Sequence, residues 1–357
     1  MKSLIKNKYD FLKLFDKFIS ETNNGKRVQK NGKRIRASSL KNYFYLRKLL
    51  FDFSSDKNFP LHISSLNSLK KREIQSEKKY WKSFYKSFSD YLYDDLNLFD
   101  NYVGSCMKRL RAFFNYLNDE KEMSVGNFHK GFFIQSEEIE IITLLPEQLN
   151  FLIFDKEFEN NLPEHLQRTK DAFTFGCTVA LRVSDLFKIT FSNVEKVNDK
   201  NYLKVISQKT STFTRVLLPD YAVDIINKYR SNKSYIFPMI SKNRLNINIK
   251  LLIERTNWTH EHIKIRHKRG IPVMVYKNTN NKEHYRFCDH ITSHTMRRTA
   301  ITTMLCLNMP ENFVRKISGH APNSKEFFRY VQLSQKYMDS ESEKMFDLLK
   351  TKKLICQ

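Results

Sequence analysis

The sequence predicts a mainly α-helical fold with a small antiparallel sheet, an α+β class, divided into two domains. Three observations support this. The chain has 357 residues, which is long enough for two domains with ordinary cores. Apolar side chains recur at helical spacing along most of the chain, as in residues 8–22. Strand-like alternation is confined to short stretches, chiefly YLKVIS (202–207) and TRVLLP (214–219), which indicate a hairpin.

The N-terminal domain is predicted to be a compact group of helices. The helix over residues 8–22 is followed by helices near 38–53, 79–95 and 98–118. The inner side of the second helix is expected to contain Leu40, Tyr43, Phe44 and Leu50. We therefore expect a helical domain over residues 1–120.

Residues 121–143 lose the helical periodicity and mix charged residues, glycine and short apolar pieces, so we predict an interdomain linker there. The second domain is predicted over residues 144–357. Short strand-like runs fill 262–290, and helices follow from residue 294. Earlier helices of this domain are expected near 146–155, 164–179, 221–231 and 246–257.

The charge balance limits the possible partners. The chain carries 62 Lys and Arg against 38 Asp and Glu, a formal net charge of +24. A protein this basic is expected to meet a polyanion, either nucleic acid or an anionic membrane surface. No apolar run reaches the length of a membrane span, and the N-terminus lacks the features of a signal peptide. We therefore expect a cytoplasmic protein without membrane association.

Metal-binding spacings are not found in the sequence. The five cysteines are scattered, without a CxxC pair. His260, His262 and His267 lie close in sequence, but no cysteine or carboxylate follows at ligand spacing. We therefore expect a polar loop there and no metal site.

A strongly basic segment lies between the first two predicted helices. In NGKRVQKNGKRIRASSLKNY (24–43) the motif GKR occurs twice. Such a charge run is often only a solvated loop, but the net charge of +24 favours an arm that contacts phosphates. The candidate DNA-binding residues are Lys26, Arg27, Lys30, Lys33, Arg34 and Arg36.

The stretch SHTMRRTAITTML (293–305) has the pattern of a helix whose first turn is positively charged. His294 and Arg297 are three residues apart and share a face of this turn, while Arg298 is rotated away from them. A helix N-terminus is already the positive end of the helix dipole, so added positive charge does not stabilise the helix. A bound anion would account for the arrangement, because backbone N–H groups and arginines would meet the same oxygens.

Four further residues complete a candidate site. They are Arg182 in LRVSDL, Lys209 in the hairpin turn QKT, His320 after a glycine and Tyr330 in FFRYV. Taken singly, each has an ordinary structural explanation: an arginine paired with Asp185, a solvated lysine, a core tyrosine. Together with the histidine-arginine pair, they form a pattern that is improbable by chance.

These residues resemble the tyrosine recombinases, also called the phage integrase family, over residues 144–335. LRVSDL is similar to the family's first-arginine motif, SHTMRRT to its His-x-x-Arg box, and FFRYV to the segment that carries the nucleophile. The HT-x-RRT box and the Q-x-T hairpin look most like integrases of mobile elements from Bacteroidetes-type bacteria. One departure lies at residues 179–181, Val-Ala-Leu, where the family commonly has Thr-Gly before the Leu-Arg pair.

The resemblance implies a mechanism and partners. Tyr330 would attack a DNA phosphate and form a 3′-phosphotyrosine link, while Arg182 and Arg297 bind the phosphate oxygens. His294 would accept or shuttle the tyrosine proton, His320 would hydrogen-bond the phosphate, and Lys209 would protonate the leaving 5′-oxygen. No metal or nucleotide cofactor is implied. The implied partner is double-stranded DNA bound by a homotetramer, with accessory DNA-bending proteins as possible further partners.

The resemblance also implies roles for the two ends of the chain. The N-terminal helical domain is similar in size and position to the family's core-binding (SAM-like) domain. In the family, C-terminal tails such as SESEKMFDLLKTKKLI (340–355) dock on a neighbouring protomer, and packing on its own domain is an equal alternative here.

Two other functions are compatible with parts of the pattern. A type IB topoisomerase-like enzyme would relax DNA with the same catalytic groups, although the two-domain size favours recombination. A basic architectural protein would bind DNA without cutting it, although all six catalytic positions carry the required residue types.

Overall fold

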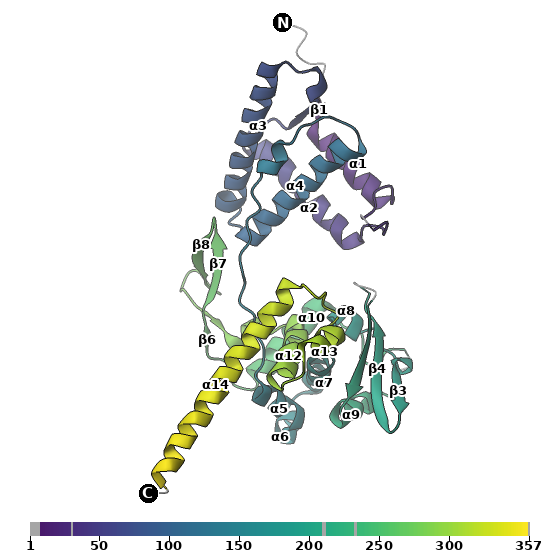
Figure 1. The fold of residues 1–357 in the computed structure, drawn as a ribbon, viewed down its shortest axis with the longest axis vertical. Coiled ribbons are helices and arrows are strands. Elements are labelled where there is room, and N and C mark those ends of the chain that lie inside the picture. The colour runs from purple at the N-terminus through teal and green to yellow at the C-terminus, as the bar shows by residue number, and fades with distance from the viewer. Residues whose placement is uncertain (1–7, 30, 209–211, 232–233, 356–357) are drawn as a thin grey trace. The chain divides into compact units, whose positions relative to one another are not determined.

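The structure is a computed structural model that describes residues 8–29, 31–208, 212–231 and 234–355. The chain divides into two compact units, each labelled by its elements in Figure 1. The first consists of Met1–Ile139 together with Ile265–Val275, and the second of Glu140–Lys264 together with Tyr276–Gln357. The fold is mainly helical with small antiparallel sheets, as predicted.

The first unit is built on helices around an aromatic core. Its helices are α1 (Phe11–Asn23), α2 (Ala37–Asp56), α3 (Lys71–Asp90) and α4 (Asp100–Asn115). Single π-helical turns extend α3 and α4 as η2 (Tyr91–Asp95) and η3 (Tyr116–Glu120). Short strands β1 (Lys8–Asp10) and β2 (His62–Ser64) pair antiparallel.

Aromatic side chains at helical spacing explain why these helices pack together. Phe11, Phe15 and Phe18 of α1 are fully buried, and the Phe15 ring meets Phe113 of α4 edge to face at a centroid distance of 4.8 Å. Asp10 begins α1 by accepting a hydrogen bond from the Lys13 amide. Phe44, which was predicted to lie on the inner side of α2, is instead 58% exposed.

The first unit extends past the boundary predicted at residue 120. Val125, His129 and Phe132 are buried in its core, and the 3₁₀ turns η1 (Leu66–Ser68) and η4 (Phe128–Gly131) lie on it. A side chain at Gly104 of α4 would meet the Gln135 carbonyl oxygen at 1.9 Å. This close approach shows that residues predicted as a linker pack tightly against α4, so the first unit ends at Ile139.

The second unit places α7 (Glu164–Val179) at the centre of a helical group. Helices α10 (Lys242–Glu254) and α12 (Ser293–Cys306) pack against α7, and α5 (Pro146–Phe154) and α9 (Asp220–Lys228) contact it as well. Short helices and turns complete the set: α6 (Lys156–Asn160), α8 (Val183–Leu186), η5 (Phe191–Asn193), α11 (Phe287–His290) and α13 (Glu311–Ser318).

The predicted hairpin of the second unit belongs to a three-stranded sheet. Strand β4 (Lys200–Ile206) pairs antiparallel with both β3 (Val194–Val197) and β5 (Phe213–Leu218). The strand β3 was not predicted, because VEKV is too short to show a clear alternation. Separately, β6 (Glu261–His262) pairs with β9 (Tyr285–Arg286), and β7 (Lys264–Lys268) pairs with β8 (Ile271–Val275).

The C-terminal helix is longer than predicted. Helix α14 runs from Lys325 to Ile355, so Tyr330 and the tail segment lie on one helix. In Figure 1 its C-terminal part extends away from the other helices of its unit. Met345 and Phe346 are about half exposed. In the described part of the chain, none of the helices has both the length and the apolar character that crossing a membrane requires.

Candidate active site

Arg182 lies at the point where α7 ends and α8 begins. Ala180 closes α7 in the left-handed region, with φ 54°, and Arg182 is the N-cap residue of α8. Its guanidinium donates a hydrogen bond from Nη1 to Ser207 Oγ at 3.0 Å, and Ser207 Oγ donates in turn to Asp185 Oδ2 at 3.0 Å. Asp185 and Ser207 are both buried, so this chain fixes Arg182 beside the end of β4.

The first turn of α12 holds the second arginine. Thr292 caps the helix by accepting a hydrogen bond from the His294 amide. Arg297 is 8% exposed and donates from Nη1 to the Ala180 carbonyl at 2.8 Å and from Nη2 to the Ser318 carbonyl. The two carbonyls come from the ends of α7 and α13, so Arg297 joins three helices. His294, on the same turn, is solvent-accessible.

His320 follows directly after the end of α13. Gly319 ends this helix in the left-handed region, with φ 63°, a conformation that glycine adopts without strain. Ser318 Oγ lies 2.7 Å from the Val314 carbonyl oxygen and 2.8 Å from His320 Nδ1. A hydroxyl has one hydrogen, and the nearer carbonyl oxygen takes it. We therefore assign the Nδ1 proton to His320, which donates it to Ser318 and leaves Nε2 as an acceptor in the neutral ring.

Tyr330 lies on the second turn of α14, within a small apolar cluster with Ala300, Ile301 and Phe327. Its side chain is 4% exposed, and its ring lies 5.9 Å from the His320 ring, centroid to centroid. Arg298 of α12 lies near the hydroxyl. Burial, followed by the Glu326 charge, raises the pKa of Tyr330, whereas the charges of Arg298 and Arg297 act in the opposite direction.

Positive charges accumulate where these residues meet. Burial and then the Arg182 charge lower the pKa of Arg297 to about 10, so the Arg297 guanidinium is still charged at neutral pH. Burial and the charges of Arg297 and Arg182 lower the pKa of His320 to about 4, so its ring is neutral there. The pKa of His294 is also lowered, by desolvation first and then by the Lys242 and Arg298 charges. Clustered guanidinium groups of this kind suit a phosphate.

The structure thus brings five of the six predicted catalytic residues together: Arg182, His294, Arg297, His320 and Tyr330. The sixth, Lys209, lies outside the described residues. Ser207 and Thr212 flank this segment, and the Ser207 amide donates a hydrogen bond to the Thr212 carbonyl at 2.9 Å. A side chain at Gly319 would lie 3.7 Å from Thr212, so this end of the sheet reaches the residue before His320.

Sequence reasoning missed two parts of the site. Ser207 and Asp185 hold Arg182 through the hydrogen-bonded chain described above, whereas the sequence suggested only a direct pair between Arg182 and Asp185. Arg298, which the sequence places away from the face shared by His294 and Arg297, lies near the Tyr330 hydroxyl and acts to lower its pKa. The doubled arginine in the motif was the only sequence signal for this contact.

The predicted DNA-binding loop divides into two classes. Lys26, Lys33, Arg34 and Arg36 are exposed, and Lys30 lies outside the described residues. Arg27 is buried: its guanidinium lies 4.0 Å from the Phe18 ring centroid, donates to Thr22 Oγ1 at 2.7 Å and pairs with Glu120 at 3.2 Å. Arg27 therefore stabilises the first unit, and we remove it from the candidate DNA-binding set.

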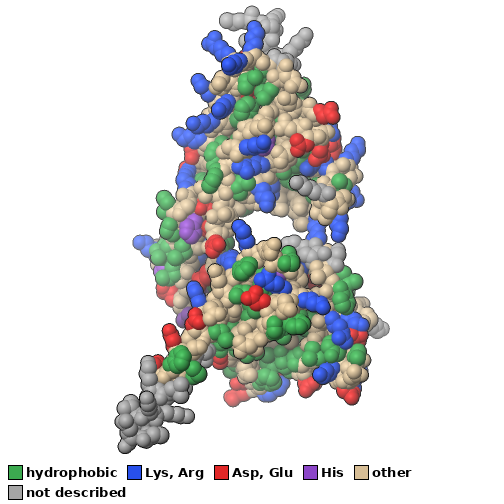
Figure 2. Space-filling model, viewed as in Figure 1, with side chains coloured by type: hydrophobic (Ala, Val, Ile, Leu, Met, Phe, Trp, Pro, Cys, Tyr) green, Lys and Arg blue, Asp and Glu red, His purple; other side chains and the backbone are tan. Residues whose placement is uncertain are grey.

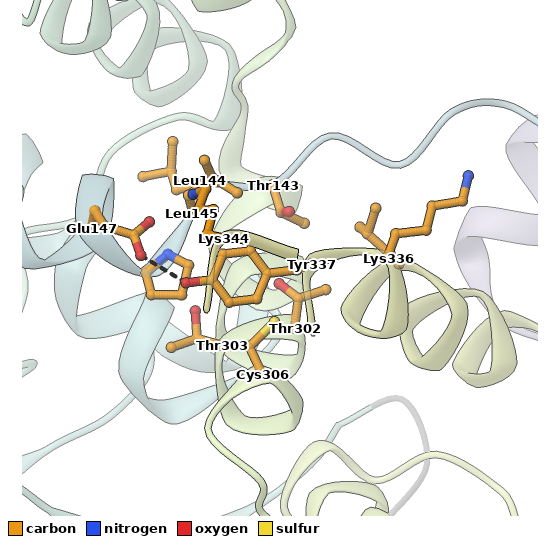
Figure 3. A pocket seen from close by; sticks show the side chains of 12 residues that line it. Thr143, Leu144, Leu145, Glu147, Thr302, Thr303, Cys306, Lys336, Tyr337 and Lys344 are labelled. Atoms are coloured by element: carbon orange, nitrogen blue, oxygen red, sulfur yellow. Dashed lines mark hydrogen bonds between the residues drawn. The ribbon is translucent and has the colours of Figure 1, made fainter. Parts of the chain in front are cut away.

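A second tyrosine near the C-terminus, Tyr337, lies in a different environment. Figure 3 shows it in a pocket lined by Leu144, Thr302 and Cys306, with its hydroxyl hydrogen-bonded to Glu147 Oε1 at 2.7 Å. None of the catalytic candidates lines this pocket. Of the two tyrosines, Tyr330 is therefore the one placed among the arginines. In the part of the chain that the structure describes, no group of three or more His, Cys, Asp or Glu side chains is arranged to hold a metal ion.

Comparison with known proteins identifies the family of this chain. Residues 156–336 match the model of the phage integrase family. A search of curated proteins finds no relative. Many solved structures match. One is the Tn1549 transposon integrase in complex with a circular intermediate DNA, which is 14% identical with a TM-score of 0.57, over 94% of this chain and 98% of that chain.

Two other integrase or recombinase structures share the fold. A lambda integrase dimer bound to a COC′ core site is 13% identical with a TM-score of 0.56, over 91% of this chain and 78% of that one. The XerH site-specific recombinase bound to a palindromic difH substrate is 11% identical with a TM-score of 0.58, over 91% of this chain and 90% of that one. Because the family match spans just over half of the residues, the chain belongs to the phage integrase family, the tyrosine recombinases, whose members cleave and rejoin DNA.

Proposed function

We propose that this recombinase cleaves and rejoins DNA at specific sites with Tyr330 as its nucleophile, for integration, excision or resolution. The observation that carries the assignment is the position of Tyr330: its ring packs against His320, and the charges of Arg297 and Arg298 act on its hydroxyl. A phosphate bound by Arg182 and Arg297 would lie within the same group of side chains. The two arginines would also stabilise the additional negative charge of a pentacoordinate transition state.

The proposed step breaks one bond and forms one bond. Tyr330 Oη attacks the phosphorus, a 3′-phosphotyrosine link forms, and the 5′-oxygen leaves with a proton from Lys209. His294 accepts or relays the tyrosine proton, and His320, once its ring is protonated, donates a hydrogen bond from Nε2 to the phosphate. The 5′-hydroxyl of the partner strand then attacks the link, which restores the phosphodiester and frees Tyr330. The energy of the broken bond is retained, so the step balances without a nucleotide cofactor.

The buried state of Tyr330 implies a rearrangement on DNA. The side chain is 4% exposed, and Arg298 lies near its hydroxyl. An attack on DNA requires this hydroxyl to become accessible to the phosphate and to lose its proton. The charges that lower its pKa, Arg298 and Arg297, belong to the same turn of α12 that is proposed to bind the phosphate.

Double-stranded DNA is the proposed substrate of both units. Figure 2 shows Lys and Arg side chains gathered along the side of the first unit that α3 forms. Exposed lysines three, four or seven residues apart lie on one side of α3 and make that side basic. The sequence analysis did not single them out. These residues are Lys71, Lys78, Lys79, Lys82 and Lys86. Together with Lys26, Lys33, Arg34 and Arg36, they are the proposed phosphate contacts of the first unit, which would serve as the core-binding domain.

A homotetramer is the proposed active assembly. A lambda integrase tetramer bound to a Holliday junction shares the fold, with 13% identity and a TM-score of 0.53. In the present chain, Met345 and Phe346 on α14 are about half exposed, which supports docking of the tail on a neighbouring protomer rather than on its own unit. The proposal further includes an origin in a Bacteroidetes-type mobile element, supported by the HT-x-RRT box, action in the cytoplasm, and accessory DNA-bending proteins.

Trapping of the covalent intermediate tests this proposal. In a pool of nicked duplexes with randomised sequence, the short fragment that carries the new 5′-hydroxyl is lost after cleavage, so a protein–DNA adduct accumulates and is seen by denaturing electrophoresis. Wild type and Tyr337→Phe are expected to form the adduct, and Tyr330→Phe to form none, because it lacks the attacking oxygen.

The controls separate the competing functions. Tyr330→Phe should keep its duplex affinity, since the phenyl ring preserves packing. DNA binding without any wild-type adduct would indicate an architectural protein. An adduct accompanied by relaxation of supercoiled DNA, with no joining of two duplexes, would indicate a topoisomerase-like enzyme. An adduct with Tyr330→Phe would assign the nucleophile elsewhere.

A further inference from the structure

The hairpin β7–β8 belongs to the first unit although its sequence lies within the second. Residues Ile265–Val275 join the first unit, so the chain passes between the units three times, after Ile139, after Lys264 and after Val275. In Figure 1 the hairpin has the green colour of its late place in the chain, whereas the rest of the first unit is purple to blue. The contacts of this hairpin with the first unit have no role in the proposed chemistry.

The turn of the hairpin is held by one buried carboxylate. Arg269 and Gly270 both have positive φ, 52° and 80°, the pattern of a type I′ turn. Their two amides donate to the two oxygens of Asp100, at 2.7 Å from Arg269 and 2.9 Å from Gly270. Asp100 is 1% exposed and also accepts a hydrogen bond from the Tyr93 hydroxyl at 2.7 Å. The hairpin therefore supplies two of the donors that this buried carboxylate requires.

A second buried carboxylate holds the first strand of the hairpin. Glu137, whose side chain is 1% exposed, accepts from Arg266 Nε at 3.0 Å and Nη2 at 2.6 Å, and from the His267 amide at 2.6 Å. Asn101 of α4 fixes the Glu137 backbone by a reciprocal pair of hydrogen bonds. Hydrogen bonds to Arg266 and to His267 lower the pKa of Glu137 against the opposing effect of burial, so the carboxylate is ionised at neutral pH.

The cationic side chains of the hairpin are also directed at the first unit. Arg269 donates to Asp90 at 2.7 Å and to Asp94 at 2.9 Å, and its guanidinium lies 4.7 Å from the Tyr93 ring centroid. Lys268 donates to Asn97 and lies 5.7 Å from the Phe99 ring centroid. In the basic stretch KIRHKRG (264–270), Arg266 and Arg269 pair with carboxylates of the same unit, and Lys268 donates to the Asn97 amide oxygen. This neutralisation favours an intramolecular contact over a phosphate contact.

We propose that β7–β8 is an intramolecular clasp that binds Asp100 and Glu137 and keeps the two units coupled independently of the connection at Ile139–Glu140. Removing the hairpin would take two hydrogen-bond donors from Asp100 and the Arg266 ion pair from Glu137, and losing hydrogen bonds to charged groups is disfavoured. The clasp therefore stays closed in the DNA-free protein. The inference does not depend on the proposed catalytic residues, because the contact would couple the units even in an inactive protein.

Cutting the other connection tests the clasp. A site for a sequence-specific protease is inserted between Ile139 and Glu140, which are exposed. After cleavage, the two fragments of the wild-type sequence are expected to elute together in size-exclusion chromatography. With Arg266→Ala and Arg269→Ala combined, co-elution is expected to be lost. The matched control, Arg255→Ala with Lys282→Ala, removes the same charge from exposed positions outside the clasp and should co-elute like wild type.

A milder variant protects the test against loss of the fold. Gly270→Ala keeps every charge, and the added methyl group meets nothing within 4 Å, but φ 80° is strained for alanine. It should weaken co-elution without unfolding the chain, as checked by circular dichroism before cleavage. If the double variant fails to fold, the co-elution of Gly270→Ala compared with that of wild type tests the clasp. Separation of the wild-type fragments, or co-elution that neither clasp variant reduces, would overturn the proposal.

Discussion

Ala180 shows how one residue's backbone connects a sequence departure with the active site. The family commonly has glycine where this chain has alanine, and Ala180 adopts the left-handed conformation with φ 54°. That conformation costs a non-glycine residue about 1–2 kcal/mol. The chain nevertheless keeps the turn, and the Ala180 carbonyl accepts a hydrogen bond from Arg297 at 2.8 Å. The departure therefore adds local strain but leaves the turn that presents this carbonyl to Arg297.

Two basic residues of the same loop are expected to behave oppositely on substitution. Arg27→Ala should lower the free energy of unfolding by about 2–3 kcal/mol, because it removes a buried cation–π contact and charged hydrogen bonds. Lys33→Ala, at an exposed position, should change it by less than about 0.5 kcal/mol. Urea unfolding measures both effects.

The DNA-binding measurement should reverse that order. For Lys33→Ala the slope of log affinity against log salt is expected to fall by about 1, as for a lost phosphate contact. The slope for Arg27→Ala should match wild type as long as the first unit is folded. A reduced slope with Arg27→Ala and a normal one with Lys33→Ala would contradict the division of the loop made from burial.

At the level of elements, helix α4 depends on a glycine that permits close packing. At Gly104 a Cβ atom would lie 1.9 Å from the Gln135 carbonyl oxygen, which is backbone and cannot rotate away. Gly104→Ala should therefore destabilise the first unit by about 3 kcal/mol, in spite of alanine's higher helix propensity. Differential scanning calorimetry is the measurement.

A second glycine of the same unit provides the control. Gly131 has open space around it, and Gly131→Ala is expected to alter stability by less than about 1 kcal/mol. Equal melting temperatures for wild type and Gly104→Ala would show that residues 134–137 are not packed on α4 in solution.

Elements with a strong local pattern were predictable, and those defined by distant contacts were not. The prediction of a helix over 164–179 coincides with α7, and the hairpin strands were placed to within two residues of β4 and β5. Residues 121–139 carry no periodicity, because Val125 and Phe132 reach the core from irregular backbone. The position of β7–β8 on the first unit depends on ion pairs spanning more than 100 residues, which local patterns do not encode.

In the active site, the catalytic residues were predictable from the sequence and the residues that support them were not. Arg182, His294, Arg297, His320 and Tyr330 could be named because spacing and residue type mark them. Their supports could not, because the Ser207–Asp185 chain and the contact between Arg298 and Tyr330 arise only when distant segments pack.

At the level of the whole molecule, a net charge of +24 makes the protein sensitive to both protons and anions. Burial and neighbouring positive charges hold the pKa of His320 and His290 at about 4, below the ordinary value of 6.5. Unfolding restores the ordinary value, so the unfolded chain binds more protons between these two pH values. The stability of the DNA-free protein should therefore fall as pH decreases from about 6.5 towards 4.

Bound DNA is expected to reduce this loss of stability at low pH, because it raises the pKa of His320. A phosphate beside Arg182 and Arg297 offsets the charges that depress the pKa of His320. The Nδ1 proton is directed at Ser318, so Nε2 donates to the phosphate only after the ring is protonated. Binding is therefore expected to take up a proton below about pH 6.5, and stabilisation by duplex DNA should grow as pH falls.

Urea unfolding from about pH 7.5 to 5, with and without duplex, measures both the loss of stability on acidification and the stabilisation by DNA. His320→Asn should reduce the first trend, because His290 remains, and should abolish the second, whereas His165→Asn, which removes an exposed imidazole, should change neither. If the stability gained from DNA stayed constant or shrank on acidification, His320 would not be the group that meets the phosphate.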